Sequence, residues 1–265
     1  MYEQIDGVKV FYEIHGQEGF PVVLLHGWGC SSALMNPVAE ALEQEHKALV
    51  IDFPGFGQSQ VPDSAWGVPE YAACLKKLLE RLNWIPCAVV GHSFGCRVAA
   101  WAAAEWPEIF TQMVFTGAAG LKKPISEETR KRTAEFQRKK KIALQIEKIP
   151  GFKALGKNIE DKLRKKYGSA DYNALNEDMR QTFVRVVNLD LRDRYELIRS
   201  SVLLIWGDAD TETPLWMGRE MEKLIPDAGL VIFEGGSHFA YLEQKERFNL
   251  IVRHFLAGGS NGGDK

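Results

Sequence analysis

The chain has 265 residues, of which 45% are hydrophobic and 26% are charged, and its formal net charge is −2. This composition suits one large domain, with or without an insertion, and it argues against an intrinsically disordered chain. The small net charge argues against general nucleic-acid binding by the whole chain.

Cysteine content and the N-terminal residues bear on the cellular compartment. The four cysteines, at 30, 74, 87 and 96, include no C-x-x-C pair, which favours a reduced, intracellular protein. Residues 1–7 carry acidic side chains and lack the apolar centre of a signal peptide. Since no apolar stretch is long enough to span a bilayer, we expect a cytoplasmic protein without a membrane span.

The first expected element is a β-hairpin. Residues 8–14 alternate apolar and polar side chains, and the pair Asp6-Gly7 before them is typical of a tight turn. Short, continuously apolar runs follow, as in strands that are covered on both faces of a parallel sheet. These runs lie at 21–25, 48–51, 88–90, 113–115, 202–206 and 230–233.

Segments with helical periodicity lie between several of these apolar runs. From Tyr71 to Leu82 the apolar side chains fall on one helical face and the charged side chains on the other. Further helices are expected at 94–105, 214–224 and 243–256. Alternating strands and helices predict an α/β fold with a mostly parallel sheet flanked by helices.

One segment, residues 121–196, breaks the alternation because it has helical patterns but no convincing strand. We predict a helical cap inserted into a core of residues 1–120 and 197–257, followed by a flexible tail at 258–265. Residues 121–168 hold 16 Lys and Arg but 6 Asp and Glu, a net charge of +10. The insertion is either a solvated helical surface or a lid that attracts anionic substrates or a membrane surface.

A candidate nucleophile lies in residues 91–95, which read Gly-His-Ser-Phe-Gly directly after an apolar run. If a strand ends there and a helix begins, Ser93 lies on the tight bend, where the flanking glycines relieve crowding. Such a nucleophile elbow exposes the serine hydroxyl and directs the Phe94 N–H, at a helix N-terminus, toward the same space. We predict Ser93 as a catalytic nucleophile, against the alternative of a glycine-rich turn.

A serine hydroxyl needs a base to remove its proton, and the base needs an acid to hold it. Among the six histidines, His238 lies in the glycine-rich loop 235–239 after the last expected strand, where such sheets place their chemistry. His15 and His254 fall within an expected strand and helix, which favours structural roles. We predict His238 as the base, against a purely structural role as a cap of the next helix.

The acid is expected after the strand at 202–206, because the chain order in this type of fold is serine, acid, histidine. Asp208, Asp210 and Glu212 compete for this role. We prefer Asp210, and expect Asp208 to shape the loop and Glu212 to be solvated.

A second oxyanion donor is expected in the loop after the strand at 21–25. Glycines at 27 and 29 let the backbone bend there, so we assign the Trp28 N–H as the partner of the Phe94 N–H. The Trp28 side chain lines an acyl pocket or packs in the core. The chain has no Walker A pattern, dinucleotide fingerprint or zinc-ligand spacing, so we expect no cofactor and no metal.

Taken in order, these motifs resemble those of the α/β-hydrolase superfamily over nearly the whole chain, and most of all its bacterial carboxylesterases with a helical cap. The family's acid loop, G-x-x-D followed by proline, singles out Asp210. One departure is Cys96, where many relatives have a second glycine. The matching motifs are residues 26–29, 52–59, 91–95, 207–214 and 236–238.

The resemblance implies an eight-stranded α/β-hydrolase fold and a serine hydrolase that cleaves small to medium acyl esters through an acyl-enzyme. Its expected partner is a small-molecule ester. Two alternatives stay open: a C–C bond hydrolase of diketone-type substrates, and a ligand receptor on a hydrolase scaffold. In the first alternative Arg97 and the basic cap would hold a substrate carboxylate, unless Arg97 faces solvent or braces a neighbouring carboxylate.

Overall fold

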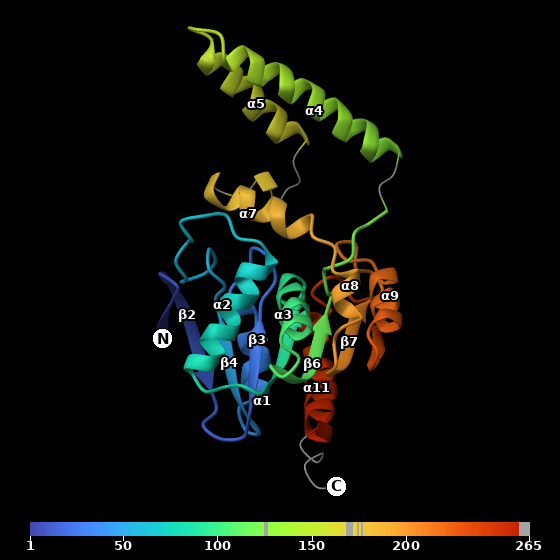
Figure 1. Ribbon diagram of the computed structural model, residues 1–265. Coiled ribbons are helices and arrows are strands. Elements are labelled where there is room, and N and C mark those ends of the chain that lie inside the picture. Colours follow the sequence, from blue (N-terminus) through green and yellow to red (C-terminus); the bar gives the residue numbers. More distant parts are fainter. Residues whose placement is uncertain (125–126, 168–171, 174, 176, 260–265) are drawn as a thin grey trace. The chain divides into compact units, whose positions relative to one another are not determined.

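A computed structural model describes residues 1–124, 127–167, 172–173, 175 and 177–259 (Figure 1). The chain divides into two compact units. The core unit comprises Met1–Leu121 and Val184–Lys265, and the insert unit comprises Lys122–Phe183. Every residue predicted for the site belongs to the core unit.

The core unit is built on an eight-stranded sheet in the order β1-β2-β4-β3-β5-β6-β7-β8, as predicted for this fold class. β1 and β2 form the predicted antiparallel hairpin, and β2 is also antiparallel to β4, whereas all later pairs are parallel. Asp6 and Gly7 turn the hairpin with φ of 47° and 86°. The strands are β1 (Tyr2–Ile5), β2 (Val8–His15), β3 (Phe20–Leu25), β4 (His46–Ile51), β5 (Cys87–His92), β6 (Phe110–Thr116), β7 (Ser201–Gly207) and β8 (Ala228–Phe233).

Helices cover both faces of the sheet. On one face α1 and α11 share a buried apolar cluster with the central strands, to which Leu24, Val90 and Val114 contribute. On the other face α2 and α3 lie side by side (Figure 1). The α-helices of the core unit are α1 (Asn36–Leu42), α2 (Val68–Arg81), α3 (Phe94–Glu105), α8 (Arg192–Tyr195), α9 (Trp216–Leu224), α10 (Ala240–Glu243) and α11 (Lys245–Gly259).

Some expected boundaries differ from the structure. The helix expected at 243–256 is two helices, α10 and α11, and α1 was not predicted. Because α11 continues to Gly259, Gly258 and Gly259 are helical. Residues 260–265 of the predicted tail lie outside the described residues. The four cysteines are free thiols.

The regular secondary structure in the described part of the insert unit is helical. α4 (Glu127–Glu147) and α5 (Lys153–Tyr167) pack against each other as a helical hairpin, and α7 (Glu177–Val187) leads back to the core unit. Residues 184–196, predicted as part of the cap, group with the core unit. In the described ranges of the chain, none of the helices has the length and apolar character that crossing a bilayer requires.

Candidate active site

Ser93 occupies the turn between β5 and α3, since β5 ends at His92 and α3 begins at Phe94. Its backbone has φ 49° and ψ −103°, a conformation that costs about 1–3 kcal/mol for a residue with a Cβ. Two backbone hydrogen bonds hold it there: Ser93 N–H donates to Thr116 O over 3.1 Å, and Ala119 N–H donates to Ser93 O over 3.2 Å. The elbow is therefore a strained turn that the surrounding sheet maintains.

Gly91 and Gly95 avoid steric clashes that a side chain would cause at these positions. A Cβ at Gly95 would lie 2.3 Å from the carbonyl oxygen of Leu25, and one at Gly91 would lie 3.0 Å from the Cys96 nitrogen. Only glycine at position 95 lets α3 begin this close to β3. Cys96 itself is buried at the start of α3, where it was expected.

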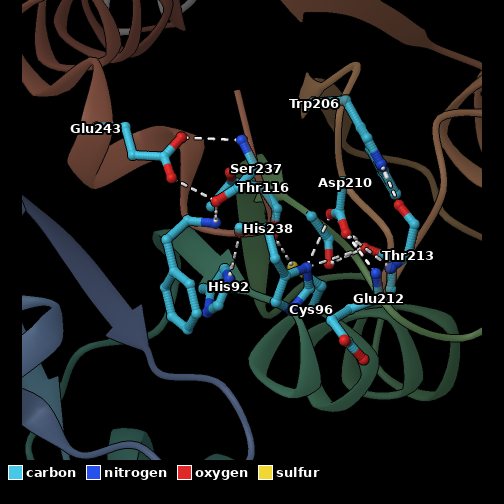
Figure 2. Close-up of polar contacts among 12 residues, drawn as sticks. His92, Cys96, Thr116, Trp206, Asp210, Glu212, Thr213, Ser237, His238 and Glu243 are labelled. Atoms are coloured by element: carbon cyan, nitrogen blue, oxygen red, sulfur yellow. Dashed lines mark hydrogen bonds and ion pairs between the residues drawn. The ribbon is translucent and has the colours of Figure 1, made fainter. Parts of the chain in front are cut away.

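A carboxylate and an imidazole meet at the carboxyl ends of the strands (Figure 2). Asp210 Oδ2 lies 2.8 Å from His238 Nδ1, and the Asp210 residue is only 4% exposed. Its other oxygen, Oδ1, accepts hydrogen bonds from the N–H groups of Glu212 over 2.8 Å and Thr213 over 2.9 Å. Both carboxylate oxygens are thus fixed, and one of them points at the imidazole.

The environment keeps Asp210 ionised. Burial alone would raise the pKa of the Asp210 carboxyl, but hydrogen bonds from His238 and Thr213 and the charge of His238 bring it below its ordinary value. An ionised carboxylate at Nδ1 favours the tautomer in which Nε2 is free to accept a proton.

Thr213 is a site residue that sequence reasoning missed. Its hydroxyl lies 2.8 Å from Asp210 Oδ2, 3.0 Å from the Gly117 carbonyl oxygen and 3.2 Å from His238 Nδ1. Together with the backbone bonds it completes an Asx-type turn that orients the carboxylate. The available signal was its position three residues after an aspartate in a loop.

His92, next to the predicted nucleophile, also lacked a predicted role. Its Nε2–H donates to the backbone carbonyl of His238 over 3.0 Å, and the two rings lie 4.8 Å apart between centroids. Burial, followed by the charge of His238, lowers the pKa of His92 to about 3, so this ring is neutral at pH 7. His92 therefore ties the loop that carries His238 to the strand that leads into Ser93.

The structure brings Asp210 and His238 into contact, but it does not join His238 to Ser93 directly. In the described ranges of the chain, the Ser93 hydroxyl forms no hydrogen bond with His238. Hydrogen bonds between a nucleophile and its base commonly tighten only when substrate binds.

Trp28 and Phe94, the predicted oxyanion residues, lie on neighbouring elements. A Cβ at Gly27 would come within 3.5 Å of Ser93 Cβ, so the loop that carries Trp28 passes close to the elbow. Phe94 is the first residue of α3, where backbone N–H groups have no acceptor inside the helix. The Trp28 ring packs edge-on against Phe56 and Phe94, at centroid distances of 4.8 Å and 5.3 Å.

Hydrogen bonds of buried polar groups hold the loop that carries Trp28 in place. His26 Nδ1–H donates to Gly27 O over 2.7 Å, and its Nε2 accepts from Phe53 N–H over 3.0 Å. Burial lowers the pKa of His26 to about 4. Asp52 accepts from the backbone of Ser32 over 2.6 Å and of Gln58 over 2.7 Å. The motif at 52–59 thus positions backbone around the site.

The two other carboxylates of the acid loop are exposed, in line with the roles expected of them. Asp208 Oδ1 accepts from the backbone N–H of Gly235 over 2.7 Å, which joins this loop to the loop that carries His238. Glu212 contributes its backbone N–H to Asp210.

Arg97 does not face solvent, which was one of the roles considered for it in the sequence. It is only 7% exposed, and its Nη1 donates to the backbone carbonyls of Val186 over 2.9 Å and Leu189 over 2.7 Å. Its guanidinium group thus anchors a chain segment from the interior of the core unit.

Comparisons with known proteins agree with the fold that the structure shows. A family model described as alpha/beta hydrolase fold matches residues 21–245. The chain is 24% identical over 261 residues to a pimeloyl-[acyl-carrier protein] methyl ester esterase of Aliivibrio salmonicida, covering 94% of this chain and 96% of that one. It is 26% identical over 269 residues to a 2-hydroxy-6-oxononadienedioate/2-hydroxy-6-oxononatrienedioate hydrolase of Escherichia coli, covering 94% and 91%. A solved meta-cleavage product hydrolase of Pseudomonas fluorescens shares the fold, with a TM-score of 0.73, 22% identity and 97% coverage of both chains.

Proposed function

Because the chain belongs to the alpha/beta hydrolase fold family, we propose that it is a serine hydrolase that cleaves carboxylic esters of small to medium acyl size. The observation that carries this proposal is the 2.8 Å contact between Asp210 and His238, beside the strained turn at Ser93. A buried acid that holds an imidazole near a half-buried elbow serine is the arrangement that acyl transfer requires.

In the proposed reaction the Ser93 hydroxyl attacks the ester carbonyl and gives its proton to His238 Nε2. Asp210 holds the opposite ring nitrogen and stabilises the imidazolium that forms. The N–H groups of Trp28 and Phe94 stabilise the oxyanion. His238 then protonates the departing alcohol, which leaves an acyl-serine. Water, deprotonated by the same histidine, releases the carboxylic acid and restores the serine.

C–C bond cleavage is the second candidate, because one relative is named as a hydrolase of a 2-hydroxy-6-oxononadienedioate. The role considered for Arg97 in that reaction loses support, because its Nη1 is committed to two backbone carbonyls. Ester hydrolysis needs no such carboxylate-binding group, and a pimeloyl ester esterase is among the relatives. A receptor without turnover has no need of an oriented Asp-His pair.

A panel of p-nitrophenyl esters of increasing acyl length tests the proposal, with a diketone ring-fission product as the competing substrate. We expect turnover of acetate or butyrate esters, and we expect Ser93→Ala to reduce kcat/KM by at least about a thousandfold. Fluorophosphonate labelling should be lost in the same variant.

Ser64→Ala is the matched control, because Ser64 is an exposed loop serine in the same unit. Its activity should stay within about twofold of the parent. Full ester turnover in Ser93→Ala would refute the assignment, and faster turnover of the diketone than of any ester would favour the second candidate.

A further inference from the structure

The turn between α4 and α5 has a defined, hydrogen-bonded structure. Residues 148–153 read Lys-Ile-Pro-Gly-Phe-Lys. Phe152 N–H donates to Ile149 O over 3.0 Å, and Gly151 has φ 83° directly after Pro150. Proline followed by a residue of positive φ is typical of a type II β-turn. The turn therefore holds two large apolar residues at its ends, with a lysine on either side.

Five large apolar residues between positions 142 and 155 are at least 39% exposed. Single exposed apolar residues are ordinary, but a group of them in a strongly charged segment marks an interaction surface. We call this group the apolar tip. Its members and their exposed fractions are Ile142 55%, Leu144 39%, Ile149 49%, Phe152 50% and Leu155 50%.

The hairpin does not use the apolar tip for its own packing. The two helices approach through small residues, because a Cβ at Gly156 would lie 2.8 Å from Ala143 O and 2.4 Å from Glu147 Cγ. Farther along, the helices pack around buried Glu160, which accepts a hydrogen bond from Arg164 over 2.6 Å. Close packing at Gly156, Ala143 and Glu160 leaves the large apolar residues near the turn at least 39% exposed.

Positive charge surrounds the apolar tip. Residues 121–168 carry a net charge of +10. The lysines nearest the tip are exposed: Lys141, Lys148, Lys153 and Lys157. Apolar side chains flanked by lysines match the interface of a bilayer that contains anionic lipids, because the apolar groups enter the acyl boundary and the cations contact the headgroups. A nucleic acid would complement the charge alone.

We propose that the α4–α5 turn docks this protein on the surface of anionic lipid bilayers. Ile149 and Phe152 enter the interface, and Lys148 and Lys153 bind the lipid phosphates. The attachment is peripheral, and it rests on the hairpin alone, so it is independent of the reaction proposed for the core unit.

Co-sedimentation of the full chain with vesicles tests the proposal, with phosphatidylcholine mixed with phosphatidylglycerol compared against phosphatidylcholine alone. We expect binding to the mixed vesicles only, and weaker binding as salt is raised. The double variant Ile149→Asp/Phe152→Asp should bind at least about tenfold more weakly. Lys148→Ala/Lys153→Ala should bind roughly 25-fold more weakly, at about fivefold per lysine.

Leu250→Asp is the matched control, since Leu250 is a 70% exposed apolar residue on α11, and it should bind like the parent. Far-ultraviolet circular dichroism of each variant must match the parent, so that lost binding reports the surface. The variants at Ile149 and Phe152 should also retain the parent's turnover of soluble esters.

Three results would overturn the proposal. The first is absence of binding to either vesicle type. The second is vesicle binding that falls with the lysine substitutions but not with the apolar ones, which indicates a general polyanion site. The third is self-association of the parent, seen by sedimentation velocity and abolished by the apolar substitutions, without vesicle binding, which indicates a contact between copies of the chain.

Discussion

The core unit and the α4–α5 hairpin treat polar and apolar side chains in opposite ways. In the core unit large aliphatic residues are buried, and the few buried charged groups, such as Asp210 and Arg97, are bonded to defined partners. In the hairpin Ala143, Gly156 and Glu160 are buried between the helices near the turn, and the apolar tip is exposed. The arrangement in the core unit suits a rigid site for chemistry. The arrangement in the hairpin suits the proposed contact with a lipid bilayer.

Charge pairs show the same contrast. Asp210 and His238 have side chains that are 0% and 14% exposed, so their interaction is weakly screened. The hairpin pair Lys131–Glu127 joins side chains that are 76% and 81% exposed. Exposed pairs four residues apart on a helix contribute only about 0.3–0.5 kcal/mol. Removing a charge should therefore matter far more in the core unit than in the hairpin.

The largest expected effect tests this contrast on the carboxylates. Asp210→Asn should reduce kcat by roughly a thousandfold to ten-thousandfold, because an amide fixes the wrong histidine tautomer, as known for serine proteases. Glu212→Gln, on the same loop but exposed, and Glu127→Gln, on the hairpin, should each stay within about twofold. Steady-state kinetics on the best ester gives these values. Equal losses in all three variants would remove the special role of Asp210.

A smaller effect concerns folding stability. Arg97→Met should lower the free energy of unfolding by about 2–4 kcal/mol, because the carbonyls of Val186 and Leu189 lose their buried donor. Lys131→Met on the hairpin should change it by less than about 0.5 kcal/mol. Urea unfolding followed by tryptophan fluorescence reports the core unit, where all seven tryptophans lie. Comparable losses of unfolding free energy in the two variants would contradict the contrast between the core unit and the hairpin.

The most gradual effect depends on pH. Burial lowers the pKa of His26 to about 4 and of His92 to about 3, while both titrate near 6.5 when unfolded. Below pH 6.5 the unfolded chain binds more protons at these two histidines than the folded chain does. The free energy of unfolding therefore has its full value above pH 6.5 and falls as the pH is lowered toward 4. The loss is at most about 1.4 kcal/mol per pH unit for each histidine.

Residues 122–183 contain no histidine, so the helicity of the insert unit should not follow this titration. Tryptophan fluorescence and circular dichroism, recorded across the same pH range, separate the two units. A free energy of unfolding that stays constant between pH 7 and pH 4 would show that the two rings are not held neutral.

Much of the core fold was predictable because continuous apolar runs mark strands that are covered on both faces. The runs at 21–25 and 88–90 each became a parallel strand, and the Asp6-Gly7 pair formed the expected turn. α1 was missed because its seven residues are too few to show a helical period. The division at Val184 depends on contacts made in three dimensions, and no change in composition marks it.

The candidate site was predictable where a backbone constraint leaves a trace in the sequence. The glycines around Ser93 and the proline after the acid loop are such traces. The contacts of Thr213, His92 and Arg97 were not predicted, because they form only when distant segments or a folded loop come together. Arg97, for example, binds oxygens 89 and 92 residues away along the chain. Any residue type can supply those oxygens, so no pairwise pattern reveals the contact.

The anchoring of the chain by Arg97 has a consequence for the insert unit. Arg97 lies on α3, the helix whose first turn follows Ser93, and it grips the polypeptide just where it re-enters the core unit. The helix that follows Ser93 thus fixes the point at which the chain returns to the core unit. We therefore expect that the helices between residues 122 and 183 can change in length without displacing the turn at Ser93.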